Sequence, residues 1–415
     1  MLGLNRLWPA RFGQRAALAL VLVITGLTSV GCGSESEAVN STSDSIDLSK
    51  LDVGPYSAGP TDVVPKDRAA MGRNLEALRL ARVMPLPQEI DPALTYYAGD
   101  VAPFTRAEDF DGGAVLELLD GERFAENTSG FVSGFHIRGQ SSDDKSIAYN
   151  ISAAAMLFET DEAASVAAPA LARTGFTRNF KYGEGTEPAQ SLQYPTAAVI
   201  WTPKMQTLAS WYATGRFVIV AVALNRENVQ LNVSDQAGLV ALADHTTSVI
   251  AERLKNFQPT PMDKLSELPV DPEGMLRLTL SRPTGDRTGY AVTGRLDSKT
   301  ALQRSTDLAR IRELYERTGV DYISYGAGEL VRTRDAAAAG VYMKEISASR
   351  FLHRIEPPPG LPVALCEKYR GPRSRAFPYH CYVTHGRYAA EIWSQQQQDA
   401  YQRISAQYAI LANDK

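Results

Sequence analysis

The sequence lacks, near its N-terminus, a hydrophobic run long enough to cross a membrane. The apolar stretch there extends over residues 16–27, whereas a spanning helix needs roughly 20 apolar residues. Arg6, Arg11 and Arg15 precede this run and small residues follow it. A charged start, a short apolar core and a small-residue end are typical of a secretory signal peptide. The pattern therefore predicts export, with residues 1–31 removed as a signal peptide.

Signatures of catalysis and of metal binding are also missing. No GxSxG motif occurs, and the related stretch GFVSG at residues 130–134 places its serine wrongly for a nucleophile. Ser133 and His136 are close in sequence, which we interpret as an accident of spacing. The chain has five histidines and three cysteines, without a CxxC or HxxxH pattern. We therefore assign no catalytic, cofactor-binding or metal-binding residues, and we expect no cofactor.

The chain has no excess of positive charge. It contains 43 Lys and Arg against 47 Asp and Glu, a formal net charge of −4. Removal of residues 1–31 takes away three arginines and no acid, which leaves 40 against 47 and a net charge of −7. Because nucleic-acid binding depends on positive surface charge, we expect no nucleic-acid partner.

Cys32 ends the signal peptide in a way that predicts lipidation. Ser29, Val30 and Gly31 precede it and resemble a bacterial lipobox, in which the cysteine thiol receives a diacylglyceryl group and becomes the new N-terminus. The lipobox usually has leucine where this chain has Ser29, and ordinary signal cleavage nearby is the alternative. A lipidated, palmitate-bearing Cys32 would anchor the protein to the outer face of the cell membrane.

The other two cysteines, Cys366 and Cys381, predict a disulfide. An isolated pair in an oxidising compartment outside the cytoplasm is most simply bonded. The competing interpretation is a metal site, because His380 and His385 flank Cys381. Together with His353, these histidines form the one cluster of titratable residues that stands out in sequence, and they suggest a pH-sensitive or ligand-facing surface.

Composition divides the chain into five parts. Residues 1–31 are the signal peptide, and residues 32–64 are polar and read as a flexible tether. An N-terminal domain is expected over residues 65–258. The proline-rich stretch 259–273 predicts a linker, and a C-terminal domain containing the disulfide is expected over residues 274–415.

The two expected domains repeat one pattern. An alanine-rich helix is predicted after Thr160 and again after Thr333, with each threonine as the N-cap. A Gly-Arg-aromatic turn then leads into a strand at residues 215–217 and again at residues 386–388. The separations are 173 residues between the helical segments, counted from Phe158 to Val331, and 171 between the turns, so we infer a duplication.

The order of elements in each half predicts the fold class. Strands, a capped helix, further strands and a closing helix give an α+β unit, an antiparallel sheet with helices on one face. Closing helices are expected at residues 241–257 and 395–411, and a surface loop at residues 225–238. The chain is therefore predicted to contain two similar α/β-sandwich units.

The first helix, expected over residues 65–84, carries an excess of basic residues. Lys66, Arg68, Arg73, Arg79 and Arg82 could meet anionic lipid headgroups or phosphorylated glycans. Charge on a helix is more often simply solvated. Anion binding at this helix is therefore a hypothesis that competes with a plain solvent-facing surface.

Several segments together resemble a known family. These are the lipobox at Cys32, the segment EALRLARVMPLPQEIDP at residues 76–92, the GRF strand, and the C-terminal GRYAAEIWSQQQQDAYQRISAQYAIL. They are similar to exported lipoproteins of mycolic-acid-bearing actinobacteria such as Mycobacterium, Nocardia and Rhodococcus, defined as a domain of unknown function with a distinct C-terminal part. The resemblance implies a host and a compartment, and it supplies no active-site residues.

Two classes of function follow. The favoured one is a membrane-anchored, non-enzymatic module that binds an envelope lipid, glycan or protein partner. The alternative is an envelope hydrolase whose catalytic residues are dispersed in sequence. Paired carboxylates, or a serine and histidine within hydrogen-bond reach, would favour the hydrolase. An apolar cleft between helices and sheet would favour the binding module.

Overall fold

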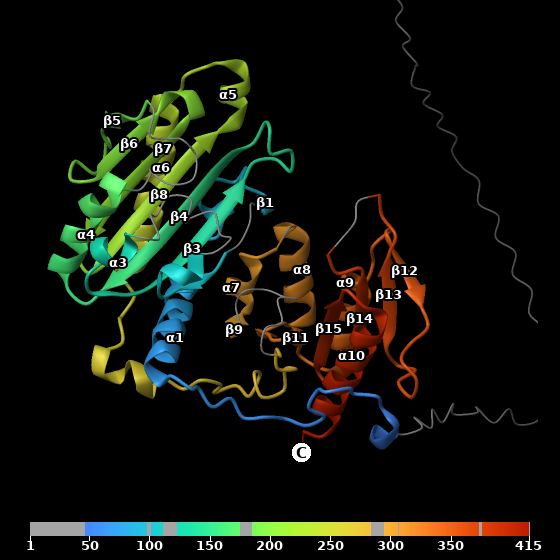
Figure 1. The fold of residues 1–415 in the computed structure, drawn as a ribbon. Coiled ribbons are helices and arrows are strands. Elements are labelled where there is room, and N and C mark those ends of the chain that lie inside the picture. The colour runs from blue at the N-terminus through green and yellow to red at the C-terminus, as the bar shows by residue number, and fades with distance from the viewer. Residues whose placement is uncertain are drawn as a thin grey trace, which may run out of the picture. The chain divides into compact units, whose positions relative to one another are not determined.

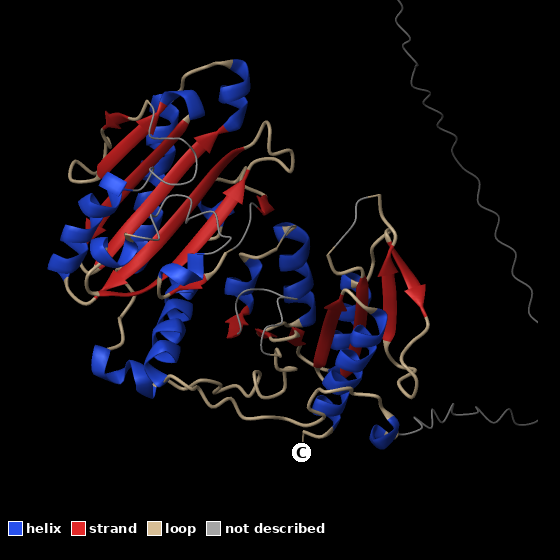
Figure 2. Ribbon diagram, viewed as in Figure 1, coloured by secondary structure: helices blue, strands red, loops and turns tan. Residues whose placement is uncertain are grey.

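Two antiparallel sheets organise the chain (Figure 1). The computed structural model describes residues 46–97, 101–110, 123–174, 185–283, 294–305, 307–372 and 376–414. The signal peptide and Cys32 lie outside the described residues. Each half combines helices with an antiparallel sheet (Figure 2), so the predicted α+β class with two similar units is confirmed.

The N-terminal sheet has the strand order β1-β3-β4-β8-β7-β6-β5, and β2 pairs with β3. All its neighbouring strands are antiparallel. The strands are β1 Tyr96–Tyr97, β2 Pro103–Phe104, β3 Phe131–Gln140, β4 Tyr149–Phe158, β5 Glu187–Ala189, β6 Ala198–Thr202, β7 Thr207–Thr214 and β8 Phe217–Asn225. The helices are α1 Arg68–Val83, α2 Pro87–Ile90, α3 Phe124–Asn127, α4 Asp161–Thr174, α5 Arg226–Leu231 and α6 Gln236–Leu254, with 3-10 turns at Ala107–Phe110 and Pro203–Met205.

The C-terminal sheet has the order β12-β13-β14-β15-β11-β10-β9, also antiparallel throughout. The strands are β9 Gly294–Asp297, β10 Tyr322–Tyr325, β11 Gly328–Arg332, β12 Leu352–Ile355, β13 Leu365–Tyr369, β14 Tyr379–His385 and β15 Tyr388–Ser394. The helices are α7 Ser298–Leu302, α8 Leu308–Thr318, α9 Ala336–Ile346 and α10 Gln397–Ala412.

The two sheets share one topology, which confirms the predicted duplication. Read from β9, the C-terminal order is β9-β10-β11-β15-β14-β13-β12, and each strand matches its counterpart in the N-terminal order. In both halves a helix, α4 or α9, follows the first long hairpin. Both halves end in a closing helix: α10 follows β15 directly, whereas α5 lies between β8 and α6.

The Gly-Arg turns occupy equivalent places in the two sheets. Gly215 joins β7 to β8 with φ of 51°, and Gly386 joins β14 to β15 with φ of 52°. This left-handed backbone favours glycine, because a Cβ would clash with the backbone. The Arg216 carbonyl accepts the amide of Phe158, and the Arg387 carbonyl accepts the amide of Thr333. Each turn therefore also fixes the end of the strand before α4 or α9.

Helices cover both faces of each sheet, where the sequence indicated one. In the N-terminal half α4 packs on one face and α6 with α1 on the other. In the C-terminal half α9 and α8 pack on one face and α10 on the other. The reason is visible in the strands: residues 153–158 of β4 and residues 217–224 of β8 are all apolar and buried, so both sides of the sheet require a cover.

Of the two predicted threonine N-caps, one is confirmed and one is wrong. The Thr160 hydroxyl accepts the Ala163 amide at the start of α4. Thr333 is not a cap, because Asp335 accepts the Ala338 amide at 2.8 Å and the Thr333 hydroxyl instead donates to carbonyl oxygens. The expected surface loop at residues 225–238 contains α5, which Asn225 caps. Asp335 and Asn225 are common N-cap residues, but the sequence did not distinguish them from their neighbours.

Two segments that composition marked as flexible are packed. Leu51, within the predicted tether, is buried in the core beside α10. Tyr56 donates a hydrogen bond to Asp399 and accepts one from Arg403, both on α10. In the predicted linker, Leu265 is buried. Polar composition hid these contacts because a few apolar anchors suffice to hold an irregular segment.

The disulfide between Cys366 and Cys381 joins β13 to β14, where the two residues are direct register partners. Both cysteines belong to the core that faces α10. Among the described residues, none of the helices combines the length and hydrophobicity that a membrane span requires.

Candidate functional site

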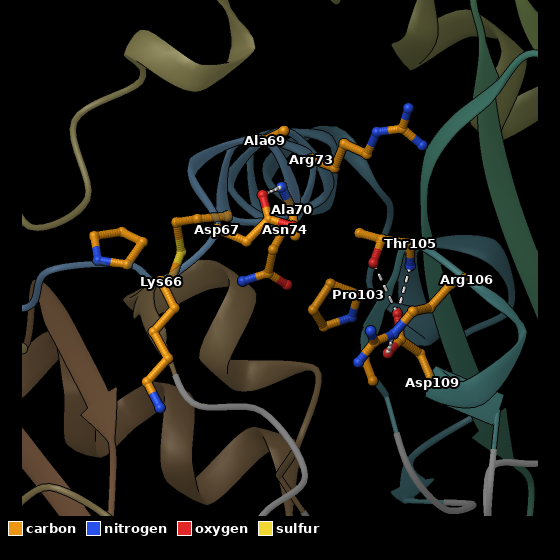
Figure 3. Close-up of a pocket in the computed structure, with 13 residues that line it drawn as sticks. Lys66, Asp67, Ala69, Ala70, Arg73, Asn74, Pro103, Thr105, Arg106 and Asp109 are labelled. Carbon is orange, nitrogen blue, oxygen red and sulfur yellow. Dashed lines mark hydrogen bonds and ion pairs between the residues drawn. The ribbon is translucent and has the colours of Figure 1, made fainter.

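A groove of about 690 Å³ lies beside the N-terminal turns of α1 (Figure 3). One wall is the segment from Pro65 to Asn74, and the other is built by β2 and the 3-10 turn that follows it. The volume is within the range typical of small-molecule sites. The groove thus combines a helix start with an irregular segment from the same half of the molecule.

The helix wall presents backbone amides and polar side chains. Asp67 caps α1 by accepting the Ala70 amide at 2.9 Å. Asn74 points into the space between α1 and Pro103 (Figure 3). Arg73 also lines the groove, and its guanidinium donates to the Phe131 carbonyl at 3.4 Å. The positive end of the helix dipole lies at this wall, which favours an anionic group.

The opposite wall is fixed by a small hydrogen-bonded turn. The Asp109 carboxylate accepts the Thr105 amide at 2.7 Å and the Thr105 hydroxyl at 2.9 Å. Arg106 forms an ion pair with the same carboxylate at 3.3 Å. These bonds hold Arg106 at the groove's edge, and they use Asp109 internally instead of leaving it for a ligand.

The basic residues predicted on the first helix separate into two groups. Lys66 and Arg73 line the groove, while Arg68 is exposed and does not. Arg79 pairs with Glu76 at 2.6 Å, and Arg82 pairs with Asp297 at 2.9 Å. The last two are therefore structural ion pairs. Their carboxylate partners neutralise them, so the anion-binding hypothesis narrows to the groove end of α1.

The buried face of α1 includes a carboxylate and a glycine. Glu76 is fully buried, and its carboxylate accepts hydrogen bonds from the amide and hydroxyl of Thr260. Gly72 is needed because a Cβ there would lie 2.2 Å from the Leu265 carbonyl oxygen. A buried, fully paired carboxylate is tolerated because each oxygen has a donor.

The three histidines of the predicted cluster do not come together. His380 contacts Glu391 and the Phe377 carbonyl on the side of the sheet that faces α9. The rings of His385 and Tyr408 meet edge to face, and Tyr408 is on α10. His353 is exposed on β12, opposite Lys368. The histidines are close in sequence, but they lie on strands whose side chains alternate between the two faces of the sheet. This alternation separates them in space.

A group that the sequence did not reveal surrounds His380. Glu329 on β11 is the register partner of Glu391 on β15, and Glu367 on β13 is the register partner of His380 on β14. Burial raises the pKa of Glu329 to about 7, and the charge of Glu391 adds to the effect. Burial likewise raises the pKa of Glu367. Only the strand register brings these residues together, so spacing along the chain gave no signal.

The remaining candidate positions offer no chemistry. Ser133 and His136 are both buried in β3, and their odd spacing places their side chains on opposite faces. Within the described residues, no three His, Cys, Asp or Glu side chains are grouped so that they could hold a metal ion.

Comparison with known proteins places the chain in a family. Residues 64–270 match the N-terminal model of a domain of unknown function, DUF7373, and residues 275–414 match its C-terminal model. A search of curated proteins gave no match. The two matches cover most of the chain, one in each half. The chain therefore belongs to the two-part DUF7373 family.

Proposed function

We propose that the protein is an exported cell-envelope lipoprotein, anchored through lipidated Cys32, that binds an anionic envelope lipid without changing it chemically. The groove beside α1 carries the proposal, because its volume of about 690 Å³ suits a lipid headgroup with the first part of its chains. No catalytic role is assigned to the groove residues.

The groove supplies both kinds of contact that such a lipid needs. Lys66 is exposed, and no partner holds it among the described residues. Its ammonium group would attract a phosphate or carboxylate group at the start of α1. The Arg73 guanidinium, which donates to the Phe131 carbonyl, adds positive charge on the same helix. Met71, Ala70 and Pro103 add apolar surface on the same walls, which suits the hydrocarbon next to a headgroup.

The anchor and the host rest on the sequence. The lipobox-like residues before Cys32 support lipidation, and the resemblance to lipoproteins of mycolic-acid-bearing actinobacteria supports the compartment and the source. Replacing Cys32 by alanine is expected to release the protein from the membrane fraction. Membrane retention of the Cys32→Ala protein would remove the anchor from the proposal.

The hydrolase alternative has one observation in its favour, the register pair of Glu329 and Glu391. Paired carboxylates with different environments are the usual acid and base of hydrolytic enzymes. The two possibilities separate in one assay. A hydrolase would convert a bound envelope lipid or glycan, and Glu391→Gln would stop the conversion, whereas a binding module would return the ligand unchanged.

The test of the proposal is native mass spectrometry of the protein extracted from its own membrane. We expect a mass above that of the processed chain, which falls to the chain mass on activation as an anionic lipid leaves. Lys66→Ala with Arg73→Ala should lose the bound lipid. Arg68→Ala is the matched control, because Arg68 is on the same helix but outside the groove, and it should keep the lipid.

The outcomes distinguish the ligand classes. A phosphorylated glycan in place of a lipid would keep the groove and change the ligand. A clean mass in the wild-type protein, or equal loss of lipid in Arg68→Ala and in the groove variant, would overturn the proposal and direct the search toward protein partners.

A further inference from the structure

The duplication allows a residue-by-residue comparison of two equivalent layers, meaning the strand side chains on the sheet face that α4 covers and those on the face that α9 covers. The equivalent turns align β8 with β15, so Glu391 corresponds to Val220. Glu329 is the register partner of Glu391, and Ala154 is the register partner of Val220. Glu329 therefore corresponds to Ala154. Ala154 and Val220 are both buried in the apolar core under α4.

The same correspondence holds for the next two strands. His380 on β14 takes the place of Ala209 on β7, and Glu367 on β13 takes the place of Ile200 on β6. Ala209 belongs to the apolar core under α4, and Ile200 packs against it. Four positions that are apolar in the N-terminal half are therefore ionisable in the C-terminal half.

This exchange is costly and unnecessary for folding. The N-terminal half shows that the same strand order closes with apolar residues in this layer. Burying ionisable groups costs free energy unless each is paired. The polar layer therefore needs a reason other than the fold.

The two hydrogen bonds of His380 require one proton more than a neutral ring beside an ionised Glu391 would supply. Its Nε2 lies 3.1 Å from the Phe377 carbonyl, which only accepts, so Nε2 carries a hydrogen. Its Nδ1 lies 2.9 Å from Glu391 Oε1. A neutral ring would present a lone pair there, facing a carboxylate that also only accepts. One proton must therefore lie between the ring and Glu391, on either atom.

Glu367 adds an independent observation. Its side chain is only 7% exposed, and its Oε2 is buried without a hydrogen-bond partner. Glu367 lies opposite His380, and Arg354 on β12 lies opposite Glu367. The layer thus contains a buried acceptor that a proton could satisfy.

Other charged and titratable groups face this layer. The Tyr342 hydroxyl on α9 donates to Glu329 at 3.4 Å, and Tyr315 on α8 lies beside Tyr342. The Arg304 guanidinium, after α7, stacks on the Tyr325 ring of β10 and provides positive charge near Glu329. Tyr382 on β14 lies opposite Glu391. Arg304 thus acts on Glu329, while Glu329 and Glu391 cannot both ionise without repulsion.

We propose that Glu329, Glu391 and His380 form a proton-binding site that fastens α9 to the C-terminal sheet. With its protons bound, one hydrogen lies between His380 and Glu391, Glu329 is neutral, and α9 packs through Tyr342. After proton loss, like charges face each other across β11 and β15 beneath α9, and the helix loosens. The ligand of this site is the proton itself, and the site works independently of the groove.

The test is amide hydrogen exchange at pH 5.5, 6.5 and 7.5, corrected for intrinsic exchange rates. Glu329 has its pKa raised to about 7, so the folded state binds more protons than the unfolded state, and its stabilisation is lost as pH rises through that value. We expect the protection of α9 to fall by up to about tenfold per pH unit. Protection of α4 should not change, which provides a control in the same molecule.

Two variants isolate the site. Glu329→Gln imitates the protonated side chain and should remove the pH dependence of α9. Glu313→Gln, an exposed change on α8, should leave it as in the wild type. Equal pH slopes for α9 and α4 in the wild-type protein would overturn the proposal without any variant, as would a wild-type slope in Glu329→Gln.

Discussion

The two halves of the molecule share a strand order, but the sheet faces beneath α4 and α9 carry different residues. Beneath α4 the sheet presents alanine, valine and tryptophan, whereas beneath α9 it presents Glu329, Glu391 and His380. A duplicated fold thus carries its own control. Apolar residues close this layer in the N-terminal half, so the ionisable residues at the same positions in the C-terminal half are candidates for an added role.

The largest expected effect comes from placing a carboxylate like that of Glu391 at the equivalent position in the N-terminal sheet. Val220→Glu would put a carboxylate at the counterpart of Glu391 without His380 or Arg304 to pair it. A buried unpaired charge should lower the free energy of unfolding by about 4 kcal/mol. Val166→Glu, at a position on α4 that is 70% exposed, is the control. Denaturant unfolding measures both, and equal stability of the two variants would contradict the assignment of the layer.

The second-largest effect is expected from the disulfide, which is in the C-terminal half. Replacing Cys366 and Cys381 together by alanine opens a loop with a sequence separation of 15, and loop entropy predicts a loss of about 3 kcal/mol. Hydrogen exchange should show weaker protection in β13 and β14, with β6 and β7 unchanged. A uniform loss in both halves would mean that they unfold as one unit.

The strap at residues 46–58 contacts α10 in the C-terminal half. Tyr56→Phe removes the hydrogen bond to Asp399, while Ser394 and Arg403 still pair that carboxylate. We expect a loss of about 1 kcal/mol, read by thermal unfolding and by faster exchange in α10. Exchange in α6, the counterpart of α10, should stay unchanged. No change in α10 would show that the strap adds nothing to stability.

The smallest effect on stability is expected in the groove. Lys66→Ala changes an exposed side chain, so the free energy of unfolding should shift by less than about 0.5 kcal/mol. Its effect on bound lipid should be large by comparison. A destabilised Lys66→Ala protein would make any loss of ligand uninformative and would assign Lys66 a structural role.

The sequence revealed the duplication because glycine in a left-handed turn has few substitutes. The Gly-Arg turns at Gly215 and Gly386 thus kept a signature that could be read directly. The disulfide was predictable for a similar reason, since Cys366 and Cys381 had few alternative partners.

Long-range pairs were not predictable. Arg82 looked like a free cation on a basic helix, but its partner Asp297 is in the other half of the chain. Glu329 and Glu391 meet only through the register of β11 and β15, which spacing along one strand does not fix. The groove needed β2 and the turn at Asp109 to close around α1, and neither had a signal in composition.

The most direct test of the comparison is to transplant the N-terminal residues into the C-terminal layer. The double variant Glu329→Ala and Glu391→Val copies Ala154 and Val220. If the polar layer serves proton binding and not folding, the protein should fold, be at least as stable as the wild type at pH 7.5, and lose the pH dependence of α9 protection. A variant that fails to fold, or that keeps the wild-type pH dependence, would contradict the account.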